Sequence, residues 1–190
     1  MSNKELTGKE SLELITSMIN QAKSNYQKGG SFYFLLWGWV VMIANFTHYY
    51  LDAFTDYQYP YIVWIVTIPA GIISGIYGSR QSKRAQVKSH LDSLYGHVWL
   101  AVGVGILTVL VFMNKLEFNH NAVIMLFSGI GTYISGQLLR FKPLMLGGLV
   151  LAITSIVCFN VSITDQYLVG GVGIFAGYLI PGYLLKSKEK

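Results

Sequence analysis

Long, uninterrupted runs of apolar residues make up most of the chain from residue 31 onward. Each run holds roughly 20 residues without Asp, Glu, Lys or Arg, the length that an α-helix needs to cross the hydrocarbon core of a bilayer. The runs are continuous rather than alternating, which favours helices over the strands of a membrane β-barrel. The pattern predicts six transmembrane helices, over residues 31–51, 60–78, 94–113, 121–139, 143–161 and 167–185.

The first thirty residues show a different pattern, with apolar residues at intervals of three or four. Between residues 7 and 27 these positions fall on one face of a helix, and Leu12, Ile15 and Ile19 form the middle of that face. The segment is too polar to cross a membrane. An amphipathic helix of this kind lies in the membrane interface or docks on another protein, so we assign residues 1–30 to a separate amphipathic segment.

Lysine and arginine are concentrated on one side of the predicted bundle. Only Lys115 falls in a loop on the opposite side, and the other thirteen fall in residues 1–30, 79–93, 140–142 and 186–190. An excess of basic residues in short loops marks the cytoplasmic side of a membrane protein. We therefore predict an integral protein of the bacterial inner membrane with both termini in the cytoplasm.

The second half of the chain contains a weak internal repeat. Residues 97–142 align without gaps on residues 143–188, with glycines, loop asparagines and terminal basic residues in register. The predicted fold class is accordingly all-α, a polytopic membrane domain of six helices over residues 31–186. The domain consists of three helical hairpins of common orientation, over residues 31–78, 94–139 and 143–185. A basic cytoplasmic loop covers residues 79–93, and residues 187–190 form a short cytoplasmic tail.

The composition agrees with this fold and excludes several kinds of chemistry. The chain is 53% hydrophobic and only 12% charged, whereas about 25% of an ordinary soluble domain is charged. The predicted spans lack the ionisable residues on which proton relays and ion-coupled pumps rely. Neither a nucleophile elbow nor a phosphate-binding loop is present, and the histidines and the single cysteine lack metal-ligand spacing. We expect no enzyme activity, no cofactor and no metal site.

Two groups of residues on the cytoplasmic side are candidates for binding. The basic loop can bind anionic lipid headgroups or an acidic partner, although its role in orientation alone also explains its charge; its basic residues are Arg80, Lys83, Arg84 and Lys88. The apolar face centred on Leu12, Ile15 and Ile19 is a candidate site for a cytoplasmic protein. Nucleic acid is a less favoured partner, because no aromatic residues lie between the basic ones.

Two histidines stand near the ends of predicted spans. His48 lies near the outer end of the first span, beside Asn45, and His97 lies near the inner end of the third. Histidine titrates near neutral pH, so both are candidate pH-sensing residues. A hydrogen-bonded or hydrated interfacial histidine with no sensing role is the simpler interpretation.

The layout resembles that of small bacterial inner-membrane proteins of the HdeD/DUF308 type, which are also built from hairpin repeats. The resemblance covers about residues 31–186, and it consists of six short glycine-rich spans without charges in their interiors. It implies a non-enzymatic membrane protein linked to stress, and it carries over no functional residue.

Two hypotheses for the function follow. The favoured one is a scaffold or regulatory component that acts through its amphipathic segment and basic loop. The alternative is an uncoupled channel or facilitator for a small solute, formed within the chain or in a homo-oligomer. Such a pathway would be lined by polar residues of the spans, among them Asn45, Thr108, Thr132 and Thr154.

Overall fold

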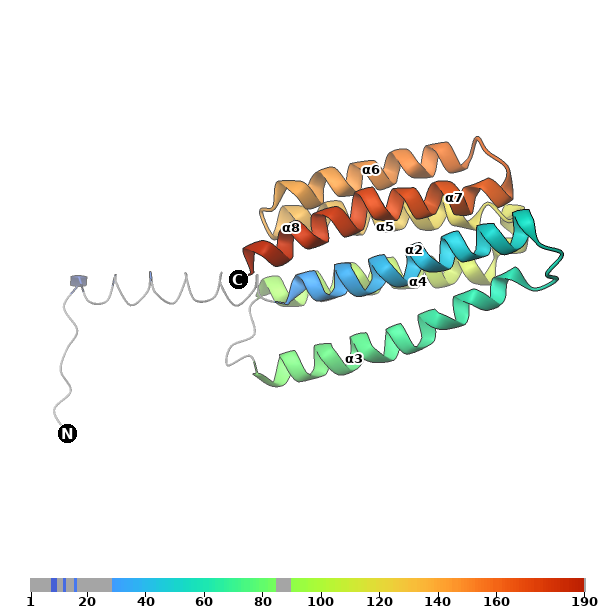
Figure 1. The fold of residues 1–190 in the computed structure, drawn as a ribbon. Helices are drawn as coiled ribbons and strands as arrows, with labels where there is room; N and C mark the ends of the chain where they lie inside the picture. Colours follow the sequence, from blue (N-terminus) through green and yellow to red (C-terminus); the bar gives the residue numbers. More distant parts are fainter. Residues whose placement is uncertain (1–7, 10–11, 13–15, 17–28, 85–89, 190) are drawn as a thin grey trace.

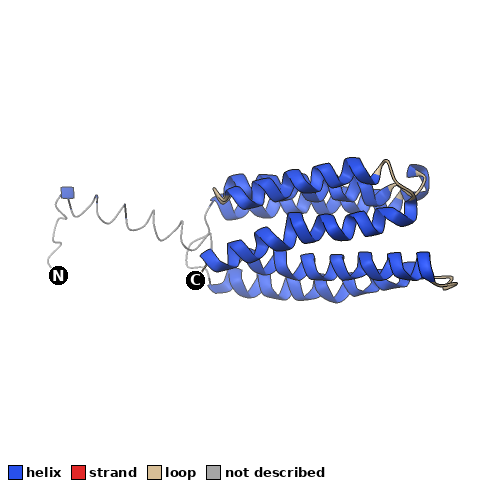
Figure 2. Ribbon diagram, turned by 45° about the horizontal axis from the view of Figure 1, so that its top comes forward, coloured by secondary structure: helices blue, strands red, loops and turns tan. Residues whose placement is uncertain are grey.

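The computed structural model describes residues 8–9, 12, 16, 29–84 and 90–189 of the chain. The regular secondary structure of these residues is entirely helical, which confirms the predicted all-α class (Figure 2). The α-helices are α2 (Gly30–Phe54), α3 (Thr67–Arg84), α4 (His90–Val111), α5 (His120–Leu138), α6 (Lys142–Cys158), α7 (Ile163–Ile174) and α8 (Ile180–Lys188). Two 3₁₀ segments, η1 (Pro60–Val66) and η2 (Met113–Leu116), and one π-helical turn, η3 (Phe175–Leu179), complete the described elements.

Several of these helices have the length and composition of membrane spans. Four stretches in the described part of the chain are long and apolar enough to cross a membrane, namely Gly30–Phe54, Pro60–Lys83, Ser93–Val111 and Ile163–Lys188. Helix α6 is also apolar but has only 17 residues, which corresponds to a length of about 26 Å.

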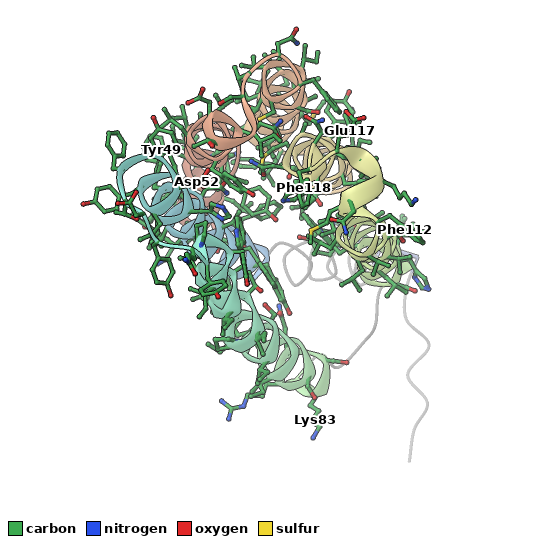
Figure 3. The ribbon with its side chains drawn as sticks, turned by 90° about the vertical axis from the view of Figure 1, so that its right-hand side faces the viewer. Tyr49, Asp52, Lys83, Phe112, Glu117 and Phe118 are labelled. Atoms are coloured by element: carbon green, nitrogen blue, oxygen red, sulfur yellow. The ribbon has the colours of Figure 1, made fainter. Side chains whose placement is uncertain are left out.

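Successive long helices run in opposite directions, so that the connections alternate between two ends of an elongated bundle (Figure 1). The end of α3, the start of α4, the α5–α6 connection and the end of α8 lie at one end, which we call the terminal end. The connections after α2, α4 and α6 lie at the other, which we call the distal end. Viewed along the bundle, α3, α2, α7, α6, α5 and α4 follow one another around an arc, with α3 and α4 at its two edges (Figure 3).

Glycines allow close contact between α5 and α6, the helix pair with the most extensive contact in the described bundle. A Cβ atom added to Gly148 of α6 would lie 2.6 Å from the backbone nitrogen of Tyr133 and 2.7 Å from the carbonyl oxygen of Gly129, both in α5. Small residues let helix backbones approach in this way. Large side chains fill the space around this pair, and those of Phe34, Met125, Leu144 and Leu151 are almost completely buried.

The last helical segment changes its hydrogen-bonding pattern where it passes α6. Pro181 has no N–H to donate to the carbonyl of Gly177, and the residues before it form the π-helical turn η3. Gly177 is also the contact point with α6, since a Cβ there would lie 2.7 Å from the carbonyl oxygen of Gly147. The π-turn thus coincides with a point of backbone contact between two helices.

The basic loop predicted over residues 79–93 is shorter in the structure than in the prediction. Helix α3 continues to Arg84 and α4 begins at His90, so both ends of the predicted loop are helical. Polar and charged residues at the ends of long helices can remain helical once they leave the apolar layer, and hydrophobicity alone does not register this extension.

Glu189, directly after α8, joins the end of that helix to the start of α2. Its carboxylate accepts hydrogen bonds from the backbone N–H and the hydroxyl of Ser31. Ser31 lies in the first turn of α2, and the preceding Gly29 supplies no side-chain cap. A carboxylate is favourable at this position because unpaired N–H groups give a helix N-terminus a partial positive charge.

Candidate functional site

A cluster of buried polar side chains lies in the distal half of the bundle, where α2, α5 and α7 meet. Asn45, Asn121 and Gln166 each expose 3% of their surface or less. The amide nitrogen of Asn121 donates to the main-chain oxygen of Gln166 at 2.7 Å and lies 3.5 Å from the side-chain oxygen of Asn45. The amide of Gln166 donates to Asn119 at 2.8 Å. These bonds tie three helices together.

His48 lies beside this cluster in an aromatic enclosure. The indole N–H of Trp64, from η1, donates a hydrogen bond to Nδ1 of His48 at 2.9 Å. The ring of Tyr167, from α7, stacks on the imidazole with a centroid separation of 3.7 Å, and its hydroxyl lies 3.4 Å from Nε2 of His120. Because Nδ1 accepts a hydrogen bond, it carries no proton, and the imidazole of His48 is held in its neutral form.

The chemistry of the polar cluster is that of neutral hydrogen-bonding groups. The nearest carboxylate on α2, that of Asp52, accepts a hydrogen bond from the hydroxyl of Thr164. Among the residues that the structure describes, no group of three or more His, Cys, Asp or Glu side chains is placed to hold a metal ion. One atom of the cluster, Oε1 of Gln166, is buried and has no hydrogen-bond partner. The cluster can join helices and bind a neutral polar group, but it offers no charged catalytic pair.

The candidate residues from the sequence do not meet at one site. Arg80 and Lys83 are exposed on the last turns of α3, at the terminal end (Lys83 is labelled in Figure 3), and Arg84 is the last residue of that helix. Leu12 is exposed, while Ile15, Ile19 and Lys88 lie outside the described residues.

The two candidate pH-sensing histidines differ in environment. His48 is buried at the distal end, within the aromatic enclosure. His97 is exposed on α4, and its Nδ1 lies 2.6 Å from the carbonyl oxygen of Ser93 in the same helix. A local bond within one helix turn does not connect His97 to another element. Of the two, only His48 makes side-chain contacts that join separate elements.

The residues expected to line a solute pathway do not face a common cavity. The hydroxyls of Thr108, Thr132 and Thr154 each donate to the carbonyl four residues earlier in their own helix, at 2.7 to 2.9 Å. Thr108 is exposed on the outer surface of α4, whereas Thr132 is fully buried. Asn45 belongs to the distal polar cluster. These four residues are therefore distributed over different parts of the bundle.

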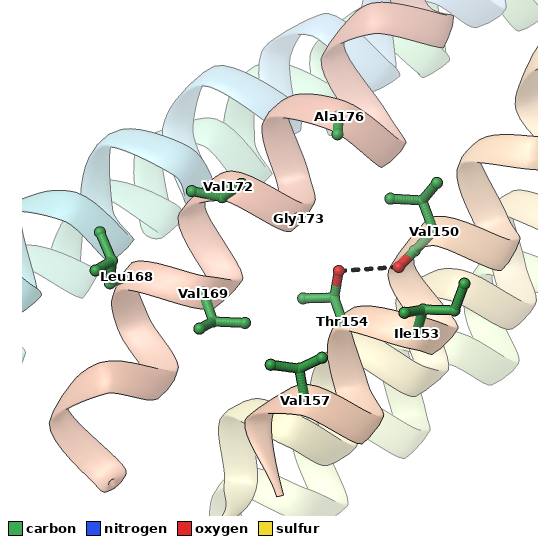
Figure 4. Close-up of a pocket in the computed structure, with 9 residues that line it drawn as sticks. All are labelled: Val150, Ile153, Thr154, Val157, Leu168, Val169, Val172, Gly173 and Ala176. Carbon is green, nitrogen blue, oxygen red and sulfur yellow. Dashed lines mark hydrogen bonds between the residues drawn. The ribbon is translucent and has the colours of Figure 1, made fainter. Parts of the chain in front are cut away.

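A groove between α6 and α7 has an almost completely apolar lining (Figure 4). Its volume is about 430 Å³. The hydroxyl of Thr154 is turned to the carbonyl of Val150, as the dashed line in Figure 4 shows, and offers little to a ligand. The residues that line the groove are Val150, Ile153, Thr154, Val157, Leu168, Val169, Val172, Gly173 and Ala176. Such a surface suits hydrocarbon chains better than a polar solute.

Sequence reasoning missed the polar cluster, although one signal was present. Asn45 and Asn121 are carboxamides within or at the edge of apolar runs. A strongly polar side chain in such a run requires a buried partner, because an unpaired amide is costly in an apolar medium. Their partner, Gln166, stands just before the last predicted span, and nothing in its local sequence indicates that it is buried.

Comparisons of the chain with protein-family models, with curated proteins and with solved structures gave no match.

Proposed function

We propose that this chain is an integral protein of the bacterial inner membrane, with six membrane-spanning helices and both ends in the cytoplasm. It acts there as a non-enzymatic scaffold or regulatory component, through residues 1–30 and the basic segment 79–93. The observation that supports this proposal best is the unequal charge of the two ends of the bundle.

Seven basic residues belong to the terminal end by their places on the helices or in the α5–α6 connection, whereas Lys115 lies at the distal end (Figure 1). The seven are Arg80, Lys83, Arg84, Arg140, Lys142, Lys186 and Lys188. An excess of Lys and Arg of this kind is typical of the cytoplasmic side of a membrane. The terminal end is also where the amphipathic segment joins α2, so charge and apolar binding face would act on the same side.

The packing of the interior favours a binding role over transport. Helices α5 and α6 touch through glycines, and one buried hydrophobic cluster around Phe34 includes residues of α2, α5, α6 and α7. The polar residues considered for a solute pathway bond to their own helices or to the distal cluster. A scaffold requires a stable body with exposed binding faces, and this arrangement agrees with that requirement.

Photo-crosslinking from the amphipathic face tests the proposal. A photoreactive amino acid replaces Leu12 in the full chain, expressed in bacterial membranes. We expect a discrete crosslinked protein product that disappears when Ile15 and Ile19 are replaced by serine. Glu13→Gln, which changes a polar position of the same segment, serves as the matched control and should leave the product unchanged.

The channel hypothesis is tested on the same preparation. Liposomes that contain the purified chain are mixed rapidly with glycerol or urea, and their swelling is followed by light scattering. The scaffold proposal predicts swelling at the rate of protein-free liposomes. Accelerated swelling, together with the absence of a crosslinked product, would overturn the proposal in favour of a small-solute channel.

A further inference from the structure

A basic recess opens at the terminal end, where the α5–α6 connection meets the last turn of α8. Its volume is about 420 Å³. Three cationic residues, Arg140, Lys142 and Lys188, line it together with Ser187, and no acidic residue is among its lining. Three cations around one hollow, without a carboxylate to neutralise them, form a site of positive potential for an anion.

The backbone of the α5–α6 connection places Arg140 at this site. The N–H of Phe141 donates to the carbonyl of Gly136 at 2.8 Å, and the N–H of Arg140 donates to that of Gln137 at 3.1 Å. These two bonds form a Schellman motif, whose left-handed position is usually glycine. Here Arg140 occupies that position with a φ of 49°. A guanidinium thus stands at the recess where the backbone would favour a residue without a side chain.

The opposite wall is fixed by an aromatic contact. Phe141 is buried, and the ammonium nitrogen of Lys188 lies 5.0 Å from the centre of its ring. A cation over an aromatic face is attracted by the negative charge density of the ring. Lys188, at the end of α8, is therefore held against the α5–α6 connection rather than being a lysine that samples solvent freely.

The recess has apolar as well as cationic lining, and this combination limits which anions it can bind. Pro143 and Leu184 complete its lining, and Leu184 is an exposed apolar residue. Leu146, one turn further along α6, is also exposed and apolar. Cations at the rim and apolar surface along the adjacent helices match a phosphate joined to hydrocarbon chains.

We infer that this recess binds the phosphate of an anionic phospholipid headgroup, whose acyl chains lie along α6 and α8. The inference rests on the membrane location in the proposed function, but it concerns a site apart from residues 1–30 and 79–93. A soluble phosphate has the same anionic chemistry, and the apolar wall favours the lipid.

Lipid binding to the purified full chain in mild detergent tests the inference. Phosphatidylglycerol, phosphatidylcholine and inorganic phosphate are titrated separately, and native mass spectrometry measures the bound fraction. We expect phosphatidylglycerol to bind more tightly than phosphatidylcholine. Arg140→Gly and Lys188→Gln should each weaken its binding about fivefold, the loss of about 1 kcal/mol expected for one cation near a lipid headgroup.

Two features of the variants separate binding from folding. Arg140→Gly removes the guanidinium but supplies the residue that the left-handed position favours, so the thermal unfolding midpoint should not fall. Lys115→Gln removes a cation at the distal end and should leave phosphatidylglycerol binding unchanged.

Three results would overturn the inference. Equal weakening by Lys115→Gln and Lys188→Gln would show attraction to the overall charge instead of a site. Equally tight binding of phosphatidylcholine would show that the anion is not recognised. Displacement of the lipid by an equal concentration of inorganic phosphate would assign the recess to soluble phosphate. None of these results bears on crosslinking from the amphipathic segment, so the two proposals fail separately.

Discussion

Helices α6 and α3 are both apolar and glycine-containing, yet they relate to the rest of the bundle in opposite ways. In α6, a Cβ atom on Gly148 would collide with the backbone of α5. In α3, Gly71 and Gly75 have no neighbouring atom within 4 Å of the same constructed position. A glycine therefore accompanies a backbone contact in one helix and an open surface in the other.

The same contrast appears in the polar contacts of the two regions. Helix α5, the partner of α6, carries Asn121, which is bonded to α7 and adjoins Asn45 of α2. Helix α3 is connected to α2 through stacking of Tyr77 on Phe32 and a hydrogen bond from Trp37 to Ser74 at 3.0 Å. We interpret the α5–α6 pair as the rigid centre of the protein and α3 as its most weakly attached helix.

The strongest test of this contrast adds one methyl group to each region. Gly148→Ala should lower the free energy of unfolding by about 1–3 kcal/mol, because the new Cβ atom meets backbone atoms of α5 that cannot move aside easily. Gly75→Ala should leave it unchanged or raise it by up to about 1 kcal/mol, since alanine favours the helix more than glycine does. Thermal unfolding of both variants in the same detergent measures the difference, and equal destabilisation would contradict the assignment.

A smaller effect is expected from the polar cluster. Asn121→Ala should destabilise the protein by about 1–2 kcal/mol, since the main-chain carbonyl of Gln166 loses its amide donor inside the bundle. The control is Asn160→Ala, which removes an exposed asparagine bonded only to its own helix. If the two variants unfolded at the same temperature, the cluster would not join the helices energetically.

The smallest effect is expected at the α2–α3 contact. Ser74→Ala removes the acceptor of the Trp37 indole, and should cost less than about 1 kcal/mol. Hydrogen exchange should become faster in α3 while α5 and α6 stay protected, because a weakly attached helix opens on its own. Thr108→Ala, at an exposed threonine bonded within its own helix, provides the control. Faster exchange throughout the bundle would show that α3 is as firmly integrated as the centre.

Much of the secondary structure could be predicted from the sequence. Residues 31–51 and 143–161 lie close to the observed Gly30–Phe54 and Lys142–Cys158, because a continuous apolar run marks where a helix can be shielded from water. The predicted second span ends at residue 78, whereas α3 continues to Arg84, because the last turns of that helix are polar. Hydrophobicity locates the apolar part of a helix and leaves its polar ends undetermined.

The partners of individual residues could not be predicted in the same way. Gly148 and Gly75 look alike in sequence, and only the position of neighbouring backbones distinguishes them. His48 was a candidate because of its residue type, but its contacts with Trp64 and Tyr167 depend on how η1 and α7 pack against α2. Arg140 was counted only as one basic residue among several, and its left-handed backbone at a recess is a property of the turn.

The central claim of the account is that the terminal and distal ends lie on opposite sides of a membrane, with the terminal end in the cytoplasm. The only cysteine, Cys158, is buried, so a Cys158→Ala background allows single cysteines to be placed at Lys115 and at Lys186. Intact bacterial cells are treated with a membrane-impermeant maleimide before and after permeabilisation. We predict that Lys115→Cys is labelled in intact cells and Lys186→Cys only after permeabilisation. Labelling of both in intact cells, or the reverse order, would contradict the account.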